Sequence, residues 1–291
     1  MERRWRWWAN RSARAWGRAG STASVRWTTD WHPGGRGCQS VVRLPYPGAD
    51  TDAPAPAEAV VAVRAALAAR TVAAVLVEPV QGSGGNRPAA PGFLPGLAAA
   101  CADSGTLLIL DEVVTGFGRT GAMFAATAAG VTPDLMVLGK GMGNGVPIGA
   151  VLAPAALAAL PPHGLPGGLS STFGGNPLAV AAAATTLRLL SERESAQQAA
   201  VVGTQWRLSL VQALADHPNV ESVHGTGLQI GVRLRHPVTE RAFLDGGLVV
   251  GVNGDTVRLS PPLVLTHAQA DEATDRIVRV LDRAAAREAA R

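Results

Sequence analysis

Three apolar runs in the middle of the chain each end in an ionisable residue. The runs cover residues 72–78, 106–111 and 135–140, and their last residues are Glu78, Asp111 and Lys140. Helical periodicity flanks these runs at residues 58–69 and 92–103. Near-continuous apolar strands that alternate with helices are typical of a parallel sheet buried on both faces. Because ligands bind at the carboxyl ends of such strands, the pattern predicts an α/β fold with a functional site at these three residues.

The rest of the chain divides into segments of different character. Residues 41–190 hold the three apolar runs and close with an Ala-rich helix predicted over 177–190, so we expect a large α/β domain there. Residues 191–291 carry more charge and predict a smaller C-terminal α/β domain. Its predicted elements are short strands at 220–223, 228–234 and 257–259 and a helix from about residue 267. Residues 1–40 are rich in Arg and Trp without helical or strand period, and we expect this anomalous segment to be disordered or not native.

Composition changes this picture only at the N-terminus. The formal charge of +4 and the sequence pI near 10.0 suggest a nucleic-acid binder. Residues 1–36, however, contain eight Arg and two acidic residues, a net charge of +6, which leaves −2 for the remainder. No apolar run reaches the roughly eighteen residues of a membrane span, and two cysteines are too few for a disulfide framework. We therefore expect a cytoplasmic protein with neither a nucleic acid nor a membrane as partner.

Lys140 is the only lysine among the 26 basic residues of the chain. An ammonium group can lose its proton and act as a nucleophilic amine, whereas a guanidinium effectively cannot. A single lysine at a strand end, followed by the glycine-rich stretch Gly141–Gly145, therefore indicates covalent catalysis. The covalent intermediate that a lysine amine usually forms is a Schiff base with a carbonyl group. The alternative is that codon bias removed the other lysines and left one.

Other motifs for phosphate, dinucleotide or metal chemistry are absent from the sequence. A P-loop needs Ser or Thr where Gly141 follows Lys140, and the glycine spacing gives no dinucleotide fingerprint. No Gly-x-Ser-x-Gly elbow occurs. The six His show no metal-ligand spacing, so no metal site is expected.

The predicted position of Asp111 near Lys140 suggests a chemical role for its carboxylate. A buried carboxylate on a neighbouring strand end would hold a pyridinium nitrogen protonated, which pyridoxal 5'-phosphate (PLP) needs if its ring is to act as an electron sink. The alternative interpretation is that Asp111 and Glu112 cap the next turn, a common role for Asp after a strand.

Six segments, in order along the chain, resemble the class III (ω-type) aminotransferases, which are PLP enzymes of fold type I. They are Glu78–Gly85, Pro91–Leu94, Leu107–Gly121, Pro133–Pro147, Ser171–Pro177 and Val257–Leu263. Together they are highly specific, and they lie within residues 72–282, more than two thirds of the chain. The resemblance implies a mainly parallel sheet sandwiched by helices, with 41–190 as an incomplete PLP-binding large domain and 191–291 as the small domain.

The resemblance also implies roles for individual residues around the cofactor. Lys140 would form the Schiff base with PLP and then move the proton between the substrate carbon and the cofactor carbon. Asp111 would pair with the pyridine nitrogen, and Val113 would pack on one face of the ring. Thr172 would reach the cofactor phosphate of the neighbouring subunit, so a homodimer is the expected unit.

Two further residues would bind the substrate by the same resemblance. Arg258 would receive a substrate carboxylate, because a guanidinium pairs with a carboxylate through two parallel hydrogen bonds. Glu78 would lie at the edge of the site as a partner for that arginine. The alternatives are a surface ion pair for Arg258 and a structural role for Glu78.

The sequence departs from the family pattern at three places. Ser83 stands where members that alternate between glutamate and an ω-amino substrate often carry an acidic residue. Val114 stands where many carry a Gln that donates to the ring oxygen of the cofactor. The family's Ser-Gly-Thr/Ala phosphate loop and its aromatic-His-Gly segment have no counterpart upstream of Glu78. We therefore expect an N-terminally truncated or frame-disrupted member with weakened affinity for PLP.

The expected reaction is PLP-dependent transfer of an amino group between an ω-amino acid or amine and a 2-oxo acid of the pyruvate or 2-oxoglutarate type. The Asp-Glu-Val-Val form of the motif at Asp111 favours the pyruvate-linked group. Two alternatives stay open. One is a catalytically impaired or inactive fragment of such an enzyme, and the other is a different class III activity (aminomutase, racemase or decarboxylase).

Overall fold

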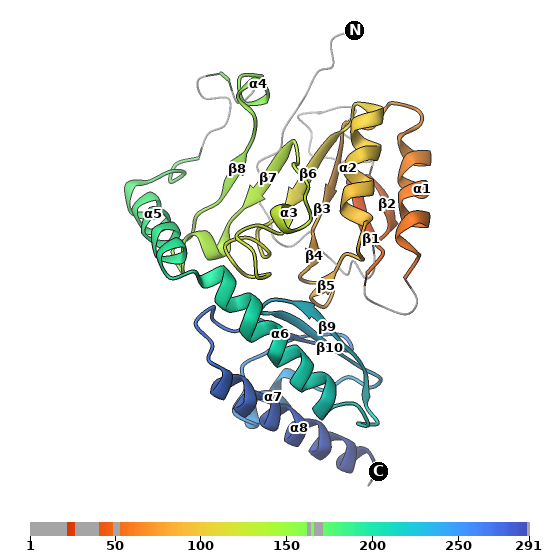
Figure 1. Cartoon of the computed structure of the whole chain (residues 1–291), viewed down its shortest axis with the longest axis vertical. Coiled ribbons are helices and arrows are strands. Elements are labelled where there is room, and N and C mark those ends of the chain that lie inside the picture. Colours follow the sequence, from red (N-terminus) through yellow and green to blue (C-terminus); the bar gives the residue numbers. More distant parts are fainter. Residues whose placement is uncertain (1–21, 27–40, 49–52, 162–163, 166–170, 290–291) are drawn as a thin grey trace.

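A six-stranded sheet forms the centre of the N-terminal part of the molecule. The computed structural model describes residues 22–26, 41–48, 53–161, 164–165 and 171–289. The sheet has the order β2 (Val41–Pro45), β1 (Thr22–Arg26), β3 (Ala74–Val77), β6 (Leu107–Asp111), β7 (Leu135–Leu138) and β8 (Ala150–Leu152). The three central strands β3, β6 and β7 run parallel, and the flanking pairs are antiparallel. The expected α/β fold with a parallel core is therefore confirmed (Figure 1).

Helices α1 (Pro56–Leu67) and α2 (Phe93–Ser104) lie side by side in this part and contribute to its core. Alternate residues of β3 and β6, such as Val75 and Leu110, are fully buried against Leu67 of α1 and Leu97 of α2. The residues between them, such as Ile109, are only partly buried. Complete burial of both strand faces, expected from the apolar runs, is therefore not seen in the described residues.

Short elements complete this part of the molecule. The two-stranded hairpin β4 (Val80–Gln81) and β5 (Arg87–Pro88) follows β3. Helices α3 (Ala125–Ala128) and α4 (Ala155–Ala158) have four residues each, and the 3-10 helix η1 spans Lys140–Met142. None of these elements, nor β1, β2 or β8, was expected from the sequence pattern, because two to five residues carry too little periodicity to be recognised.

A second, antiparallel sheet forms the C-terminal part. Its order is β11 (Gly251–Asn253), β12 (Thr256–Leu259), β10 (Gln229–Leu234) and β9 (Val220–Thr226). Helices α6 (Ser195–Ala213), α7 (Glu240–Asp245) and α8 (His267–Ala289) accompany it, and the core between them includes Trp206, Ile230 and Phe243. Trp206 Nε1 donates a hydrogen bond to Thr274 Oγ1 at 3.1 Å, which satisfies the one polar group of the indole inside this core.

Helix α5 (Pro177–Glu192) leads from the first part to the second. Asn176 caps its N-terminus, since Oδ1 accepts from Ala179 N at 2.9 Å. The helix ends at Glu192 with Arg193 as its C-terminal cap, and Glu194 takes a left-handed backbone conformation with φ of 48° before α6 begins. The sequence pattern predicted α5 and α8 close to their observed bounds but did not predict α6.

The Arg- and Trp-rich segment 1–40 falls mostly outside the described residues. The exception is β1 at Thr22–Arg26, which pairs with both β2 and β3 in an antiparallel sense. The structure therefore places a strand inside a segment for which no regular structure was expected. Residues 1–21 and 27–40, including Cys38, lie outside the described residues.

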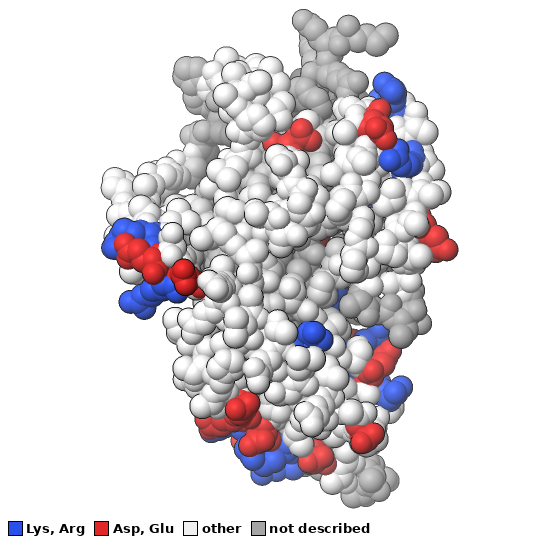
Figure 2. Space-filling view, in the orientation of Figure 1, with Lys and Arg blue, Asp and Glu red and all other residues white. Residues whose placement is uncertain are grey.

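Charged side chains are unevenly distributed over the surface. On the face shown in Figure 2 they gather in small groups, notably around the end of α5 and along the lower edge near α8. The sequence has no Asp, Glu, Lys or Arg between Gly141 and Leu187, a stretch that includes β8, α4 and most of α5. Among the described helices, none combines the length and the apolar character that crossing a membrane requires.

Candidate active site

Glu78, Asp111 and Lys140 lie at one edge of the central sheet. Glu78 follows the last residue of β3, Asp111 is the last residue of β6, and Lys140 comes two residues after β7. Because these three strands are adjacent and parallel, their carboxyl ends meet at the same edge (Figure 1). The structure therefore brings together the three residues that the strand pattern singled out.

The Lys140 side chain extends from a tight turn. Gly139 is extended with φ of −179°, and Lys140, the first residue of η1, has a left-handed φ of 40°. Such a conformation is uncommon for a residue with a side chain and is often found at functional sites. The side chain is exposed, and within the described residues Nζ has no hydrogen bond or ion pair. The amine is therefore held at the strand ends by its backbone and left available for a ligand.

Asp111 is largely buried at the end of β6. Its Oδ1 accepts a hydrogen bond from Val113 N at 3.0 Å, which fixes the carboxylate across the turn that follows the strand. Burial raises the pKa of Asp111, while the bond from Val113 and the positive charge of Lys140 oppose that rise. An ionised Asp111 is therefore incompletely compensated by the protein, and a cationic ligand group would stabilise it.

Glu78 shares this electrostatic environment. Its Oε2 accepts from Gly82 N at 3.0 Å, within the turn that leads into β4. Burial raises its pKa, and the negative charge of Asp111 adds to that rise; the bond from Gly82 and the charge of Lys140 act in the opposite direction. The hydroxyl of Tyr46 donates to the carbonyl of the next residue, Pro79, at 2.9 Å and anchors the strand end.

Val113 lies beside the residue that precedes Lys140. A methyl group at Gly139 would stand 3.5 Å from Val113 Cγ1, an ordinary packing contact. The valine side chain is therefore next to the backbone that carries the amine and two residues from the Asp111 carboxylate. An apolar side chain in this place can support one face of a flat ring.

Arg258 is on the other sheet, in β12. Its backbone pairs with Gly251 of β11 and Gly231 of β10, so the side chain has no neighbouring side chain at either partner. The guanidinium lies over Gly251, where an added Cβ would be 2.8 Å from Nη2. Arg258 Nε is buried without a hydrogen-bond partner in the described residues, and no ion pair joins Arg258 to Glu78 there. The expected pairing of these two residues stays a prediction.

The loop with Thr172 is separate from the strand-end cluster. Thr172 and its neighbour Phe173 are exposed, and Phe173 has 79% of its surface accessible. Asn176 Nδ2 donates to Phe173 O at 2.9 Å and holds the loop against the start of α5. Within one chain no hydrogen bond joins Thr172 to Lys140 in the described residues, and the role of Thr172 toward a neighbouring subunit stays a prediction.

Two buried polar residues, Glu112 and Asn86, and the partly buried Arg119 were not singled out by the sequence for a role of their own. Glu112 is fully buried, and its carboxylate accepts from Thr115 Oγ1 at 2.7 Å and from the amides of Ala125 and Ala126 at 2.9 and 2.7 Å. It therefore caps α3. The capping interpretation also fits Asp111, whose Oδ1 accepts from Val113 N in the turn after the strand at 3.0 Å, so the cofactor role of Asp111 stays a prediction. Asn86 and Arg119 form hydrogen bonds between the two parts of the molecule. In the described residues no group of His, Cys, Asp and Glu side chains could hold a metal ion.

The comparisons with known proteins agree on one family. The model of the class-III aminotransferases matches residues 14–281. A curated acetylornithine aminotransferase of Mycobacterium tuberculosis (strain ATCC 25618 / H37Rv) is 42% identical over 216 residues, which are 73% of this chain and 53% of that protein. The counterpart from Rhodobacter capsulatus is 42% identical over 232 residues, 77% of this chain and 56% of that protein.

Solved structures give the same result. The ornithine delta-aminotransferase of Plasmodium falciparum matches with a TM-score of 0.72 and 35% identity, over 77% of this chain and 59% of that one. An acetylornithine aminotransferase from Elizabethkingia anophelis matches with a TM-score of 0.71 and 31% identity, over 77% of this chain and 58% of that one.

The chain therefore belongs to the class-III aminotransferase family, whose members have the fold type I architecture and use PLP. It spans about half the length of the curated relatives it matches. The expectations of the family and the fold are confirmed.

Proposed function

We propose that this chain carries the cofactor and substrate site of a PLP-dependent aminotransferase. The reaction is the transfer of an amino group between an ω-amino acid or amine and a 2-oxo acid of the pyruvate or 2-oxoglutarate type. The observation that carries the proposal is the strand-end cluster. The only lysine of the chain stands there beside Asp111 and Glu78, two largely buried carboxyl groups of raised pKa.

The groups at the strand ends fit the reactive end of PLP. Lys140 Nζ has no partner in the described residues and is an amine that an aldehyde can take up. The Asp111 carboxylate accepts a single backbone hydrogen bond and has capacity for a pyridinium N–H. Val113, beside Gly139, offers an apolar contact for the ring. PLP, when bound, supplies the electron sink that lets a proton leave the amine-bearing carbon of the substrate.

The chain's own residues then have distinct tasks. Lys140 would hold the cofactor through its amine, and the free amine would carry a proton to and from the substrate carbon. Asp111 would keep the ring nitrogen protonated, because burial disfavours its charged form and a pyridinium N–H would stabilise that form. Arg258 binds a carboxylate of the amino acid or oxo acid, since its buried Nε has no protein acceptor in the described residues. Glu78 lies between the hairpin and Lys140 and shapes the charge at the edge of the site.

The relatives support an amino donor with a terminal amine. Acetylornithine and ornithine aminotransferases, as their names say, act on molecules of that kind. An ω-amino acid would present its amine to Lys140 and its carboxylate to Arg258. This assignment is part of the proposal, because the chain covers little more than half of those proteins.

We also propose that the working unit is a homodimer. The uncharged stretch Gly141–Leu187 exposes large apolar side chains. Among the described residues the most accessible of them are Phe173 (79%), Leu178 (73%), Leu165 (54%) and Leu152 (51%). Contiguous exposed apolar surface without charge is a mark of protein–protein contact. Thr172 lies in the same region, so a second copy docked here would bring that hydroxyl to a neighbouring site.

The test is an amino-transfer assay on the PLP-loaded chain. Ornithine or N-acetylornithine serves as donor with pyruvate or 2-oxoglutarate as acceptor, and the new alanine or glutamate is measured by mass spectrometry. The matched variant is Lys140→Arg, which keeps the positive charge but has no nucleophilic amine. We expect product with the native chain and none with the variant. Equal product from both would contradict the role of Lys140, and no product from the native chain would favour an inactive fragment.

A further inference from the structure

Arg119 joins the loop that follows Asp111 to the segment that follows Arg258. Its Nη1 donates to Pro261 O at 2.5 Å and to Leu228 O at 3.1 Å. Its own carbonyl accepts from Leu228 N at 3.0 Å. Hydrogen bonds from a charged donor are about twice as strong as neutral ones. Arg119 therefore fixes two segments of the C-terminal part from a loop that begins at the active site.

Asn86 makes a second connection from the hairpin that follows Glu78. The residue is 2% exposed and has a left-handed φ of 57°. Its Nδ2 donates to Ile230 O at 2.9 Å and to Leu259 O at 3.3 Å, and its Oδ1 accepts from Gln229 Nε2 at 3.3 Å. Leu259 is the residue directly after Arg258. Both ends of the site, the Glu78 hairpin and the Asp111 loop, thus hold the backbone next to Arg258.

These two side chains hold part of the segment Leu259–Pro262. Pro261 and Pro262 have no backbone N–H, so the turn is held through its carbonyls, and that of Pro262 accepts from Leu265 N at 3.1 Å. The carbonyls of Leu259 and Pro261 accept hydrogen bonds from two side chains of the N-terminal part, Asn86 Nδ2 and Arg119 Nη1. No other side-chain hydrogen bond to these two carbonyls is present in the described residues.

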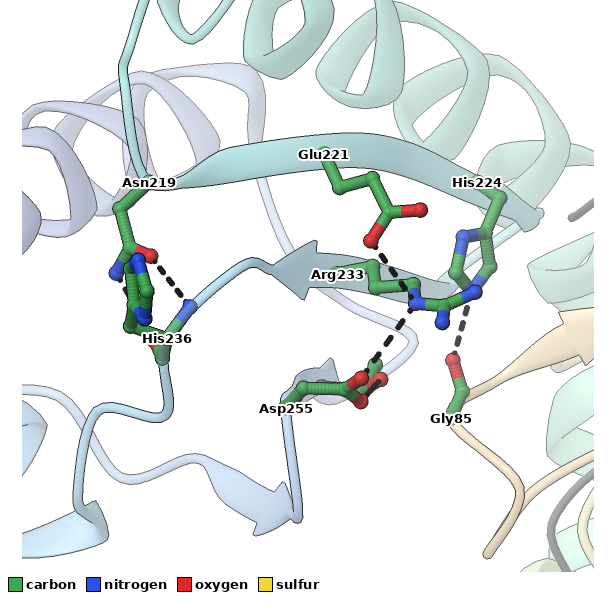
Figure 3. A network of polar contacts seen from close by, with 8 residues as sticks. Gly85, Asn219, Glu221, His224, Arg233, His236 and Asp255 are labelled. Carbon is green, nitrogen blue, oxygen red and sulfur yellow. Dashed lines mark hydrogen bonds and ion pairs between the residues drawn. The ribbon is translucent and has the colours of Figure 1, made fainter. Parts of the chain in front are cut away.

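Glycines let the two parts approach without side chains between them. An added Cβ at Gly231, the β10 partner of Arg258, would collide with the carbonyl of Gly85 and the ring of His224. A Cβ at Gly227 would collide with the carbonyl of Arg119. Figure 3 shows His224 of β9 pointing from the sheet toward Gly85, with Nε2 at 2.9 Å from the Gly85 carbonyl. Because backbone contacts backbone here, the two parts of the molecule have little room to shift relative to one another.

We propose that Arg119 and Asn86 are positioning residues, which set the Arg258 guanidinium relative to the strand ends at Glu78, Asp111 and Lys140. The inference rests on the proposed function, in which Arg258 binds the substrate carboxylate. Loss of the Arg119 clamp releases the carbonyl of Pro261, three residues from Arg258, and the guanidinium then samples positions that miss the carboxylate. We expect the amine chemistry at Lys140 to be unchanged, because Arg119 forms no hydrogen bond with Lys140 or Asp111 in the described residues.

The first measurement is hydrogen exchange of the backbone, which needs no turnover. Arg119→Met removes the clamp, and Arg119→Lys keeps a donor of shorter reach. The control is Arg276→Met on α8, which also removes a bond to a backbone carbonyl, that of Gly247 at 3.2 Å, outside the segment 257–265. We expect exchange of the peptide covering 257–265 to rise in Arg119→Met, to rise less in Arg119→Lys, and to stay native in the control. Native exchange in Arg119→Met overturns the clamp.

The second measurement separates positioning from general damage. With a carboxylate-bearing donor, KM should rise about tenfold in Arg119→Met while kcat changes little, and with a simple primary amine KM should stay native. Equal losses with both donors overturn the positioning role. If the native chain turns over neither donor, the proposed function fails, and the exchange result alone still confirms or overturns the clamp.

Discussion

Replacement of Glu112 by Gln tests how the loop between Asp111 and α3 is held. Glu112 is fully buried, and its two carboxylate oxygens accept three hydrogen bonds from Thr115, Ala125 and Ala126. Glutamine has nearly the same shape, so Glu112→Gln leaves the packing of the side chain intact. It replaces one acceptor oxygen by an NH2 group, which can donate but not accept.

The expected cost follows from the hydrogen bonds. If the NH2 group takes the place of Oε1, it faces the Ala126 amide, and the charge-assisted bond of 2.7 Å is lost. A hydrogen bond to a charged group contributes about 2 kcal/mol, and a buried donor left unpaired costs about 2 kcal/mol more. Glu112→Gln should therefore lower the free energy of unfolding by about 4 kcal/mol.

Urea unfolding followed by circular dichroism measures this loss. The matched control is Glu272→Gln on α8, where the carboxylate is exposed and pairs with Arg276 at 2.6 Å. An exposed pair of this kind contributes about 0.5 kcal/mol, so the control should stay close to the native chain. A Glu112→Gln variant as stable as the control would refute the assignment of Glu112 as the anchor of this loop.

Two other substitutions give results of opposite sign. Asp111→Asn should stabilise the cofactor-free chain at neutral pH, because burial raises the pKa of Asp111 in the folded state and disfavours its charged form. That advantage should vanish as the pH falls through the titration of the carboxyl group, and a gain that grows toward acid in urea titrations would contradict the sign. Gly231→Ala should destabilise by about 2 kcal/mol, since the methyl group meets the Gly85 carbonyl, whereas Gly149→Ala, with only an ordinary contact at 3.6 Å, should stay near native. Thermal unfolding compares the two alanine variants, and equal melting temperatures would show that the contact at Gly231 is not tight.

The residues that the sequence predicted well are those whose place follows from the strands. Glu78, Asp111 and Lys140 end apolar runs, and parallel strands bring such ends to one edge. The lone lysine also identified the chemistry of that edge, because it supplies the only nucleophilic side-chain amine of the chain. Helix α2 was also predicted well, because its helical periodicity is followed by Gly105, which ends the helix with a left-handed φ of 69°.

The elements and residues that escaped prediction depend on distant contacts. Helix α6 has weak amphipathic periodicity, and a left-handed Glu194 separates it from α5. Arg119 and Asn86 reach partners 142 and 173 residues away, at Pro261 and Leu259. No local sequence pattern predicts such a hydrogen bond, because donor and acceptor come together only after both sheets have formed.

Covalent capture of PLP tests the central claim most directly. The purified chain is mixed with PLP, reduced with borohydride and weighed as the intact protein. Because Lys140 is the only lysine, a stable adduct forms there or on the terminal amine, and Lys140→Ala separates the two sites. We expect a single adduct on the native chain that the Lys140→Ala variant lacks. An unmodified native chain, or an adduct of equal yield on the variant, would contradict a PLP site at the ends of β3, β6 and β7.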